Sequence, residues 1–324
     1  MTPKKLKKGD EIRIIAPARS LALINNETRT IANNYFKKIG LKISFSKNCE
    51  IIDGFSSSSI DERISDLHEA FSDRNVKGIL TVIGGHNSNQ LLKYIDYDLI
   101  KKNPKIVCGF SDITALANAI YAKTGLVTYS GPHYSTFGMK KGIEYTSEYF
   151  KKCLFENEDI KLNASLKWSD DQWFLNQENR VFHDNTGYKI INKGRAKGKI
   201  IGGNLCTLNL LQGTEFMPDL TDSILFIEDD ELTFKENFDR DLQSLIQQPN
   251  FNKVRAVIIG RFQIASEISE GDLFKIIKSK SELEKLPVVY NVDFGHTTPH
   301  ITFPIGGFAE VCAEDEVTIN IKEH

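Results

Sequence analysis

A serine that directly follows an apolar strand is the strongest local sign of chemistry in the chain. Lys105–Phe110 reads as a buried strand, Ser111 comes next, and a helical pattern starts at Asp112. A serine at such a turn is lifted out of the sheet, with its hydroxyl exposed beside the helix N-terminus. The position two residues later is Ile113 rather than the glycine of a GxSxG motif, and Ser-Asp is also a common helix start. Taken alone, this segment favours Ser111 as an N-cap. Together with the loops described below, it favours Ser111 as a nucleophile.

A glycine-rich loop, residues 84–89 (GGHNSN), follows the apolar strand Gly78–Ile83. Two glycines let the backbone approach a ligand closely, and the free N–H groups of the next helix can bind a phosphate or a developing oxyanion. The spacing fits neither GxGxxG nor a P-loop, so we expect no nucleotide cofactor. A tight turn with an Asn cap explains the loop equally well. His86 could act as a ligand or base, but a polar surface residue is the more common case.

Acidic and imidazole side chains follow two later strands. Ser223–Glu228 is an apolar strand that ends in an acidic cluster, and His296 follows another strand. A nucleophilic serine needs a base within hydrogen-bond reach, and that base needs an orienting acceptor. Ser111, His296 and either Glu228 or Asp229 would supply these roles. A solvated acidic loop is the simpler interpretation of the cluster.

A metal site is the competing interpretation of the histidine loop. Asp293, His296 and His300 could bind a divalent ion, but their loop lacks the helical framework of an HExxH motif. We therefore expect no metal.

The elements that must position these loops differ between the two halves of the chain. In the first half, strands alternate with helices, among them Asn26–Ile39, a helix opened by the capping box Ser59–Glu62, and a helix over 88–100. Such alternation predicts a doubly wound parallel sheet, whose sites form at the carboxyl ends of the strands. After residue 198 strands dominate, the last spanning 308–321. We predict an α/β domain over 1–160, a polar and aromatic linker or flap over 161–197, and a β-rich domain over 198–324.

Composition excludes several classes of protein. Lys and Arg number 41 and Asp and Glu 43, so the net charge is −2, which argues against a nucleic-acid binder. No apolar run approaches the ~20 residues of a membrane span, so no membrane partner is expected. The five cysteines lack a CxxC pair and are odd in number. We therefore expect no disulfide scaffold, and we expect a cytoplasmic location.

Taken together, six segments in order resemble the LD-carboxypeptidase family of serine peptidases, and more closely its microcin C self-immunity branch. They are GGHNSNQLL (84–92), CGFSDITAL (108–116), YSGPH (129–133), IGGNLCTL (201–208), ILFIEDDE (224–231) and NVDFGHTTPHITFPIGG (291–307). The resemblance implies a Ser-Glu-His triad of Ser111, Glu228 and His296, with an oxyanion hole from the backbone N–H groups of Gly85 and Asp112. It also implies a flavodoxin-like N-terminal sheet, a barrel-like β-rich C-terminal domain and a homodimer. The triad would then join the two domains.

The branch bears on the substrate. Family carboxypeptidases release the terminal D-alanine of murein tetrapeptides in cell-wall recycling, whereas the immunity branch cleaves an aspartyl residue from a nucleotide-like group and so confers antibiotic resistance. The GGHNSNQ form and the aromatic stretch at Trp168, Trp173 and Phe174 look more like the immunity branch. These aromatic side chains, with Trp173 as the first candidate and Trp168 as the alternative, could stack on a purine, or they could pack between the domains. A rival of another class is an idle protein that binds a peptide or nucleotide without cleaving it.

Overall fold

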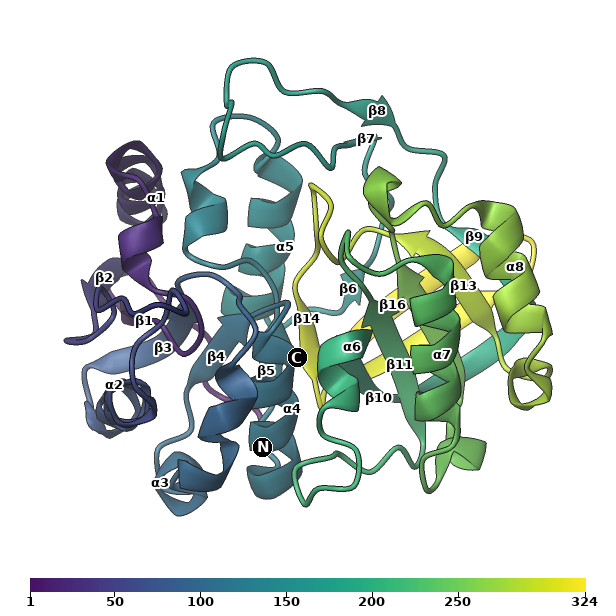
Figure 1. The fold of residues 1–324 in the computed structure, drawn as a ribbon, viewed down its shortest axis with the longest axis horizontal. Helices are drawn as coiled ribbons and strands as arrows, with labels where there is room; N and C mark the ends of the chain where they lie inside the picture. Colours follow the sequence, from purple (N-terminus) through teal and green to yellow (C-terminus); the bar gives the residue numbers. More distant parts are fainter.

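The computed structural model describes residues 1–324 as two β-sheets that lie side by side with helices on both faces (Figure 1). The first sheet has the order β14-β5-β4-β3-β1-β2, in which β2, β1, β3, β4 and β5 run parallel and β14 runs antiparallel. This 2-1-3-4-5 order is that of flavodoxin-like sheets. Its strands are β1 (Glu11–Ile15), β2 (Lys42–Phe45), β3 (Val76–Thr81), β4 (Ile106–Gly109), β5 (Thr128–Ser130) and β14 (Phe303–Ile305).

The second sheet has eight strands in the order β6-β16-β15-β10-β11-β12-β13-β9. The strands from β10 to β13 are parallel to one another, and the four outer strands pair antiparallel. Residues of the end strands β6 and β9 line one pocket, so the sheet curls toward a barrel. The strands are β6 (Ile160–Lys161), β9 (Lys189–Asn192), β10 (Gly194–Asn204), β11 (Ser223–Glu228), β12 (Ala256–Gly260), β13 (Val288–Val292), β15 (Phe308–Ala313) and β16 (Val317–Glu323). A two-stranded ribbon, β7 (Lys167–Trp168) with β8 (His183–Asp184), stands apart from both sheets.

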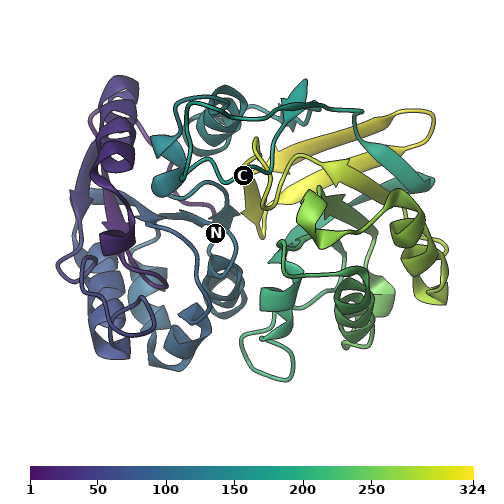
Figure 2. The same cartoon turned by 45° about the horizontal axis from the view of Figure 1, so that its top comes forward.

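Helices form two layers, as the turned view in Figure 2 shows: one comes from the first half of the chain alone, and the other extends over both halves. One layer holds α1 (Asn26–Ile39) and α5 (Glu144–Phe155), whose buried side chains pack in one core cluster. The other holds α2 (Ile60–Ser72), α3 (Tyr97–Lys102), α4 (Ile113–Thr124), α6 (Leu205–Asn209), α7 (Lys235–Ile246) and α8 (Glu270–Lys278). None of the helices combines the length and the apolar character that a membrane span requires.

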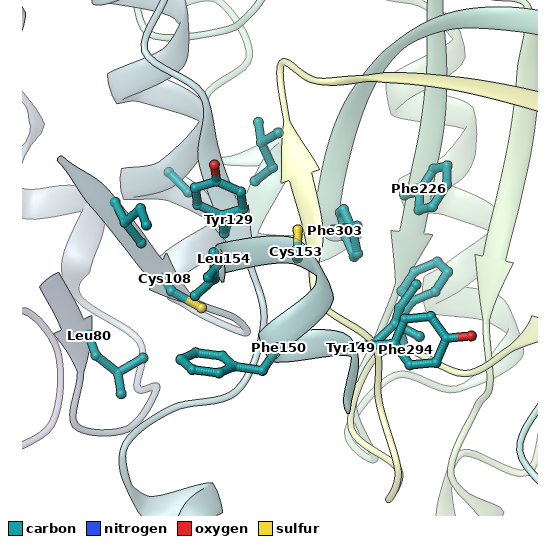
Figure 3. Packing of buried hydrophobic residues seen from close by; sticks show 14 of the residues in the cluster. Leu80, Cys108, Tyr129, Tyr149, Phe150, Cys153, Leu154, Phe226, Phe294 and Phe303 are labelled. Atoms are coloured by element: carbon teal, nitrogen blue, oxygen red, sulfur yellow. The ribbon is translucent and has the colours of Figure 1, made fainter. Parts of the chain in front are cut away.

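The two sheets share a continuous apolar core at their junction. Figure 3 shows Cys108 and Tyr129 of the first sheet in the same packed core as Phe226 of the second sheet and Phe294, two residues after β13. Phe303 of β14 lies with its ring centroid 5.0 Å from that of Phe226. Because β14 comes from the C-terminal half but pairs with β5, the chain crosses between the sheets. The division at 160 and 197 remains our proposal for the domains, and β14 departs from it.

Most elements with strong local signals are confirmed. The helix at 26–39 ends at Gly40, which has a φ of 85°, and the capping box of Ser59 and Glu62 opens α2. The predicted helix over 88–100 is wrong: a 3₁₀ helix covers Ser88–Tyr94, and α3 starts only after Asp96, whose side chain caps it. The predicted strand over 308–321 is two strands, β15 and β16, joined by a turn.

Candidate active site

Ser111 occupies a strained turn between β4 and α4. Its φ is +61°, in the left-handed region that non-glycine residues seldom adopt. Gly109 ends β4, and α4 begins at Ile113, so only three residues make the change of direction. The side chain of Ser111 makes no N-cap hydrogen bond; it lies instead against the imidazole of His296. The geometry is that of a nucleophile elbow rather than of a cap.

Ser111, His296 and Glu228 form one hydrogen-bonded chain. The distance between Ser111 Oγ and His296 Nε2 is 2.9 Å, and that between His296 Nδ1 and Glu228 Oε2 is 2.8 Å. Glu228 is the last residue of β11, and His296 lies in the loop after β13. The carboxylate can only accept, so Nδ1–H donates a hydrogen bond to Glu228; in the neutral ring Nε2 is then free to accept a hydrogen bond from the serine hydroxyl.

Electrostatics favour a charged imidazole at this place. Burial alone lowers the pKa of His296, but the charge of Glu228 and its hydrogen bond outweigh that effect and raise the pKa to about 9. The glutamate therefore stabilises the imidazolium that would form when the serine loses its proton.

The neighbouring acids bind other partners. Asp229 accepts a hydrogen bond from Asn204, and burial, with the charge of Glu228, raises the pKa of Asp229 to about 7. Asp293 pairs with Arg261 at 2.7 Å rather than with either histidine of its loop. Of the two acids that the sequence left open, only Glu228 contacts His296. No three His, Cys, Asp or Glu side chains are placed to share a metal ion.

Two buried imidazoles lie beside the nucleophile, of which the sequence analysis considered His300 only as a metal ligand and missed His133. His133 and His300 pack on the ring of Phe110, with centroid distances of 4.4 and 4.9 Å. Burial lowers the pKa of both, that of His300 to about 4, so they stay neutral beside His296. His133 also hydrogen-bonds Thr81. The only signal in the sequence was its place in YSGPH, since burial of a lone histidine has no local signature.

The glycine loop lies directly against the nucleophile. A Cβ built on Gly84 would meet Ser111 Cβ at 3.0 Å and Ser111 Oγ at 3.1 Å. The backbone N–H groups of Gly85 and Asp112 donate to no group of the protein. Two free donors beside a nucleophile are what an oxyanion hole requires. His86 is exposed at the edge of this loop, and its side chain makes no hydrogen bond.

The aromatic stretch separates into two environments. Trp168 lines a pocket with His183 and Arg261; the Arg261 guanidinium lies 5.2 Å from the indole centroid. Ser169 pairs with Thr298 through two backbone hydrogen bonds of 2.7 Å, which places Trp168 beside the loop that carries His296. Trp173 does not line this pocket and packs edge-on against Phe174, itself 54% exposed.

Both halves of the chain match models of one protein family. Residues 12–131 match the family model described as the LD-carboxypeptidase N-terminal domain, and residues 197–311 match the C-terminal domain of the same family. These two matches leave the predicted flap, residues 161–197, outside the family models apart from its last residue.

Individual relatives extend over nearly the whole chain. The crystal structure of an MccF-like protein from Bacillus anthracis str. Ames superposes with a TM-score of 0.99 at 55% identity, covering 100% of both chains. The Microcin C7 self-immunity protein MccF of Escherichia coli is 34% identical over 295 residues, 86% of this chain and 85% of its own. MccF in complex with aspartyl sulfamoyl adenosine superposes with a TM-score of 0.89 at 30% identity, covering 100% of this chain and 99% of its own. The murein tetrapeptide carboxypeptidase of Pseudomonas aeruginosa (strain PAO1) is 23% identical over 299 residues, 91% of each chain. The predicted combination of a parallel N-terminal sheet with a β-rich C-terminal sheet is confirmed.

Proposed function

The chain belongs to the LD-carboxypeptidase family, and from that premise we propose that it is a serine amidohydrolase whose catalytic residues are Ser111, His296 and Glu228. One observation carries the proposal: the unbroken hydrogen-bonded chain from Ser111 Oγ through both ring nitrogens of His296 to Glu228, at 2.9 and 2.8 Å. Ser111 and His296 lie 185 positions apart in the sequence and His296 and Glu228 lie 68 apart, and the three side chains meet at the junction of the two sheets. That arrangement is the geometric definition of a triad.

The proposed reaction is acyl transfer through Ser111. Its Oγ attacks the substrate carbonyl carbon while its proton passes to His296 Nε2, and Glu228 stabilises the resulting imidazolium. The carbonyl oxygen becomes negative and is bound by the N–H groups of Gly85 and Asp112. As the C–N bond breaks, His296 returns the proton to the leaving nitrogen. A water molecule, deprotonated by His296, then hydrolyses the acyl-serine and regenerates the enzyme.

For the substrate we propose an acidic aminoacyl residue joined to a nucleotide-like group. Trp168 supports this choice: it lies beside the loop that carries His296, because Ser169 pairs with Thr298, and its indole lines a pocket together with Arg261 and His183. A purine could stack there, and base stacking is worth roughly 1–3 kcal/mol. We assign this role to Trp168 and not to Trp173, which lies outside the pocket.

A second candidate is release of the terminal D-alanine from a murein tetrapeptide. The likeness to the murein tetrapeptide carboxypeptidase favours it, although at only 23% identity. We also propose a homodimer and a cytoplasmic location, which rest on the family resemblance and on the five cysteines, all free thiols.

One experiment separates these functions. The purified protein is incubated with aspartyl sulfamoyl-adenosine and, in parallel, with a murein tetrapeptide, while mass spectrometry follows labelling by a serine-directed phosphonate. We expect labelling at Ser111 and cleavage of the aspartyl conjugate. Cleavage of the tetrapeptide alone would select the second candidate, and binding without labelling or cleavage would indicate an idle binding protein.

A further inference from the structure

The side chain of Asp112 connects the two donors of the proposed oxyanion hole. Its Oδ2 accepts from the N–H groups of Asn87 and Ser88 at 3.0 and 2.9 Å. Its carbonyl oxygen accepts from Ser88 Oγ at 2.7 Å. The residue that offers one donor through its own N–H therefore binds the loop that offers the other, the N–H of Gly85. Asp112 is only 3% exposed, so water does not compete for these hydrogen bonds.

Arg63 holds the same loop from the opposite side. It lies in the first turn of α2, is 3% exposed, and forms no ion pair within 4 Å. Its Nη1 donates to the carbonyl oxygens of Pro17 and Asn87, each at 3.1 Å, and its Nη2 donates to Gln90 Oε1 at 2.8 Å. Burying a guanidinium without a directly paired carboxylate is costly. A purely structural role would be filled more cheaply by an apolar side chain.

The segment that Arg63 holds through Pro17 sets the direction of the Gly85 N–H. The backbone N–H of Arg19 donates to the carbonyl oxygen of Gly84 at 3.3 Å. This carbonyl and the Gly85 N–H belong to one trans peptide, so they point in opposite directions. The Gly85 N–H consequently faces away from residues 18–19, while Gly84 faces Ser111. Displacement of either segment would turn this peptide.

We propose that Arg63 and the carboxylate of Asp112 are positioning residues that hold residues 84–88 so that the Gly85 N–H stays aimed at the oxyanion. This inference rests on the serine-hydrolase function proposed above. Arg63 acts through carbonyl groups on two segments and Asp112 through two amides of the loop. Neither side chain needs to touch the substrate. Loss of either should therefore weaken transition-state stabilisation and leave ground-state binding nearly unchanged.

The test compares Arg63→Met with Arg13→Met as a matched control. Arg13, on β1, is also a buried arginine, but its guanidinium contacts Glu69 and Asp73 and makes no hydrogen bond to residues 84–88. The measurements are the phosphonylation rate of Ser111, kcat and KM for aspartyl sulfamoyl-adenosine, and Tm. Losing a whole oxyanion donor costs about 10²- to 10³-fold in kcat. A misdirected donor should cost about 10- to 100-fold, with KM changed by less than about threefold.

Arg63→Lys and Ser88→Ala keep the test decisive if Arg63→Met does not fold. The lysine retains a charge and can donate to the carbonyl groups without the planar fork, so we expect an intermediate rate. Ser88→Ala removes one bond to Asp112 and should give a smaller loss of kcat at unchanged KM. The control Arg13→Met should lower Tm but keep kcat per labelled active site.

The outcomes distinguish the two levels of the argument. Wild-type labelling rates and kcat in folded Arg63→Met or Arg63→Lys would overturn the positioning role alone, as would an effect confined to KM. An equal fall of kcat in Arg13→Met would mean that both substitutions act through general destabilisation, and this result too would overturn the positioning role. Absence of phosphonate labelling in the wild type would overturn the proposed function, and this inference with it.

Discussion

Replacing Glu228 with glutamine removes the negative charge that faces His296 and keeps the volume of the side chain. In the wild type, the pKa of this imidazole rises from 6.5 to about 9, in a ring whose side chain is only 18% exposed. At 1.36 kcal/mol for each pKa unit, this is a preference for the imidazolium of about 3 kcal/mol. The same preference stabilises the imidazolium in the transition state. Its loss should lower the maximal rate by about 10²-fold, and by up to ~10⁴-fold if the amide also reverses the ring tautomer.

The pH dependence gives the sharper signature of this change. His296 must be neutral to accept a proton, so wild-type kcat/KM should fall as the pH drops below about 9. In Glu228→Gln only burial remains, and the acidic limb should move to about pH 6.5 or lower. The wild-type advantage should therefore grow from pH 6 to pH 9, by on the order of 10²-fold.

Stability follows the same linkage with a defined sign. A group whose pKa is raised in the folded protein stabilises it below its unfolded pKa, near 6.5, and loses that contribution as the pH rises through about 9. Tm measured at pH 6 and pH 10 should thus show a larger difference between wild type and Glu228→Gln at pH 6.

The assay records kcat/KM for aspartyl sulfamoyl-adenosine and the phosphonylation rate of Ser111 from pH 5.5 to 10. The phosphonate readout does not depend on the identity of the natural substrate. Superimposable pH profiles for the wild type and Glu228→Gln would refute the assignment of Glu228 as the partner of the base.

Three further substitutions test the nucleophile, the pocket and the backbone. Ser111→Ala should keep its Tm and lose about 10⁶-fold in turnover, measured by product formation, and appreciable residual turnover would remove the triad from consideration. Trp168→Ala should weaken cleavage of the aminoacyl-nucleotide conjugate by about tenfold or more, through ~1.4 kcal/mol of lost stacking. The control Trp173→Ala should leave this cleavage unchanged. Equal losses of kcat/KM in the two variants would leave the purine assignment without support. Gly202→Ala should lower the free energy of unfolding in denaturant by more than about 3 kcal/mol. The added Cβ would lie 1.9 Å from the Phe226 carbonyl oxygen, and the φ of +139° is unfavourable for alanine. A loss below about 1 kcal/mol would show that strands β10 and β11 can move apart at little cost.

Local sequence signals predicted the elements whose stability is itself local. The capping box at Ser59 and Glu62 and the glycine at position 40 set helix ends through hydrogen bonds and a backbone conformation within a few residues. The helix expected over 88–100 divides where Ile95 is extended and the side chain of Asp96 caps a new helix. The first part also binds a distant residue, since the N–H and Oγ of Ser88 both bind Asp112, 24 positions away. Such a partner leaves no periodic pattern for a single sequence to show.

The active site shows the same difference between local signals and long-range contacts. The residue types of the triad, and the strand ends that carry them, were readable in the sequence because a strand-to-turn-to-helix pattern is local and the ordered segments resemble one family. The choice of Glu228 over Asp229 was implied by that resemblance, and the contact with His296 depends on how β11 and β13 lie in one sheet. Adjacent residues at a strand end point to opposite sides, so one acid meets the imidazole and the other meets Asn204.

What only the tertiary structure decided is how segments from different elements meet around the nucleophile. The pairing of Ser169 with Thr298 brings Trp168 beside the histidine loop, and Trp173 lies outside the pocket that Trp168 lines. Arg63 binds segments 46 and 24 positions away, and the imidazoles of His133 and His300 meet on one phenyl ring. Such contacts are set by the packing of whole elements across the shared core, and the free energy that selects them is spread over many buried side chains. The sequence therefore determined which groups can react, and the packing of the two sheets determined which of them lie within hydrogen-bond distance.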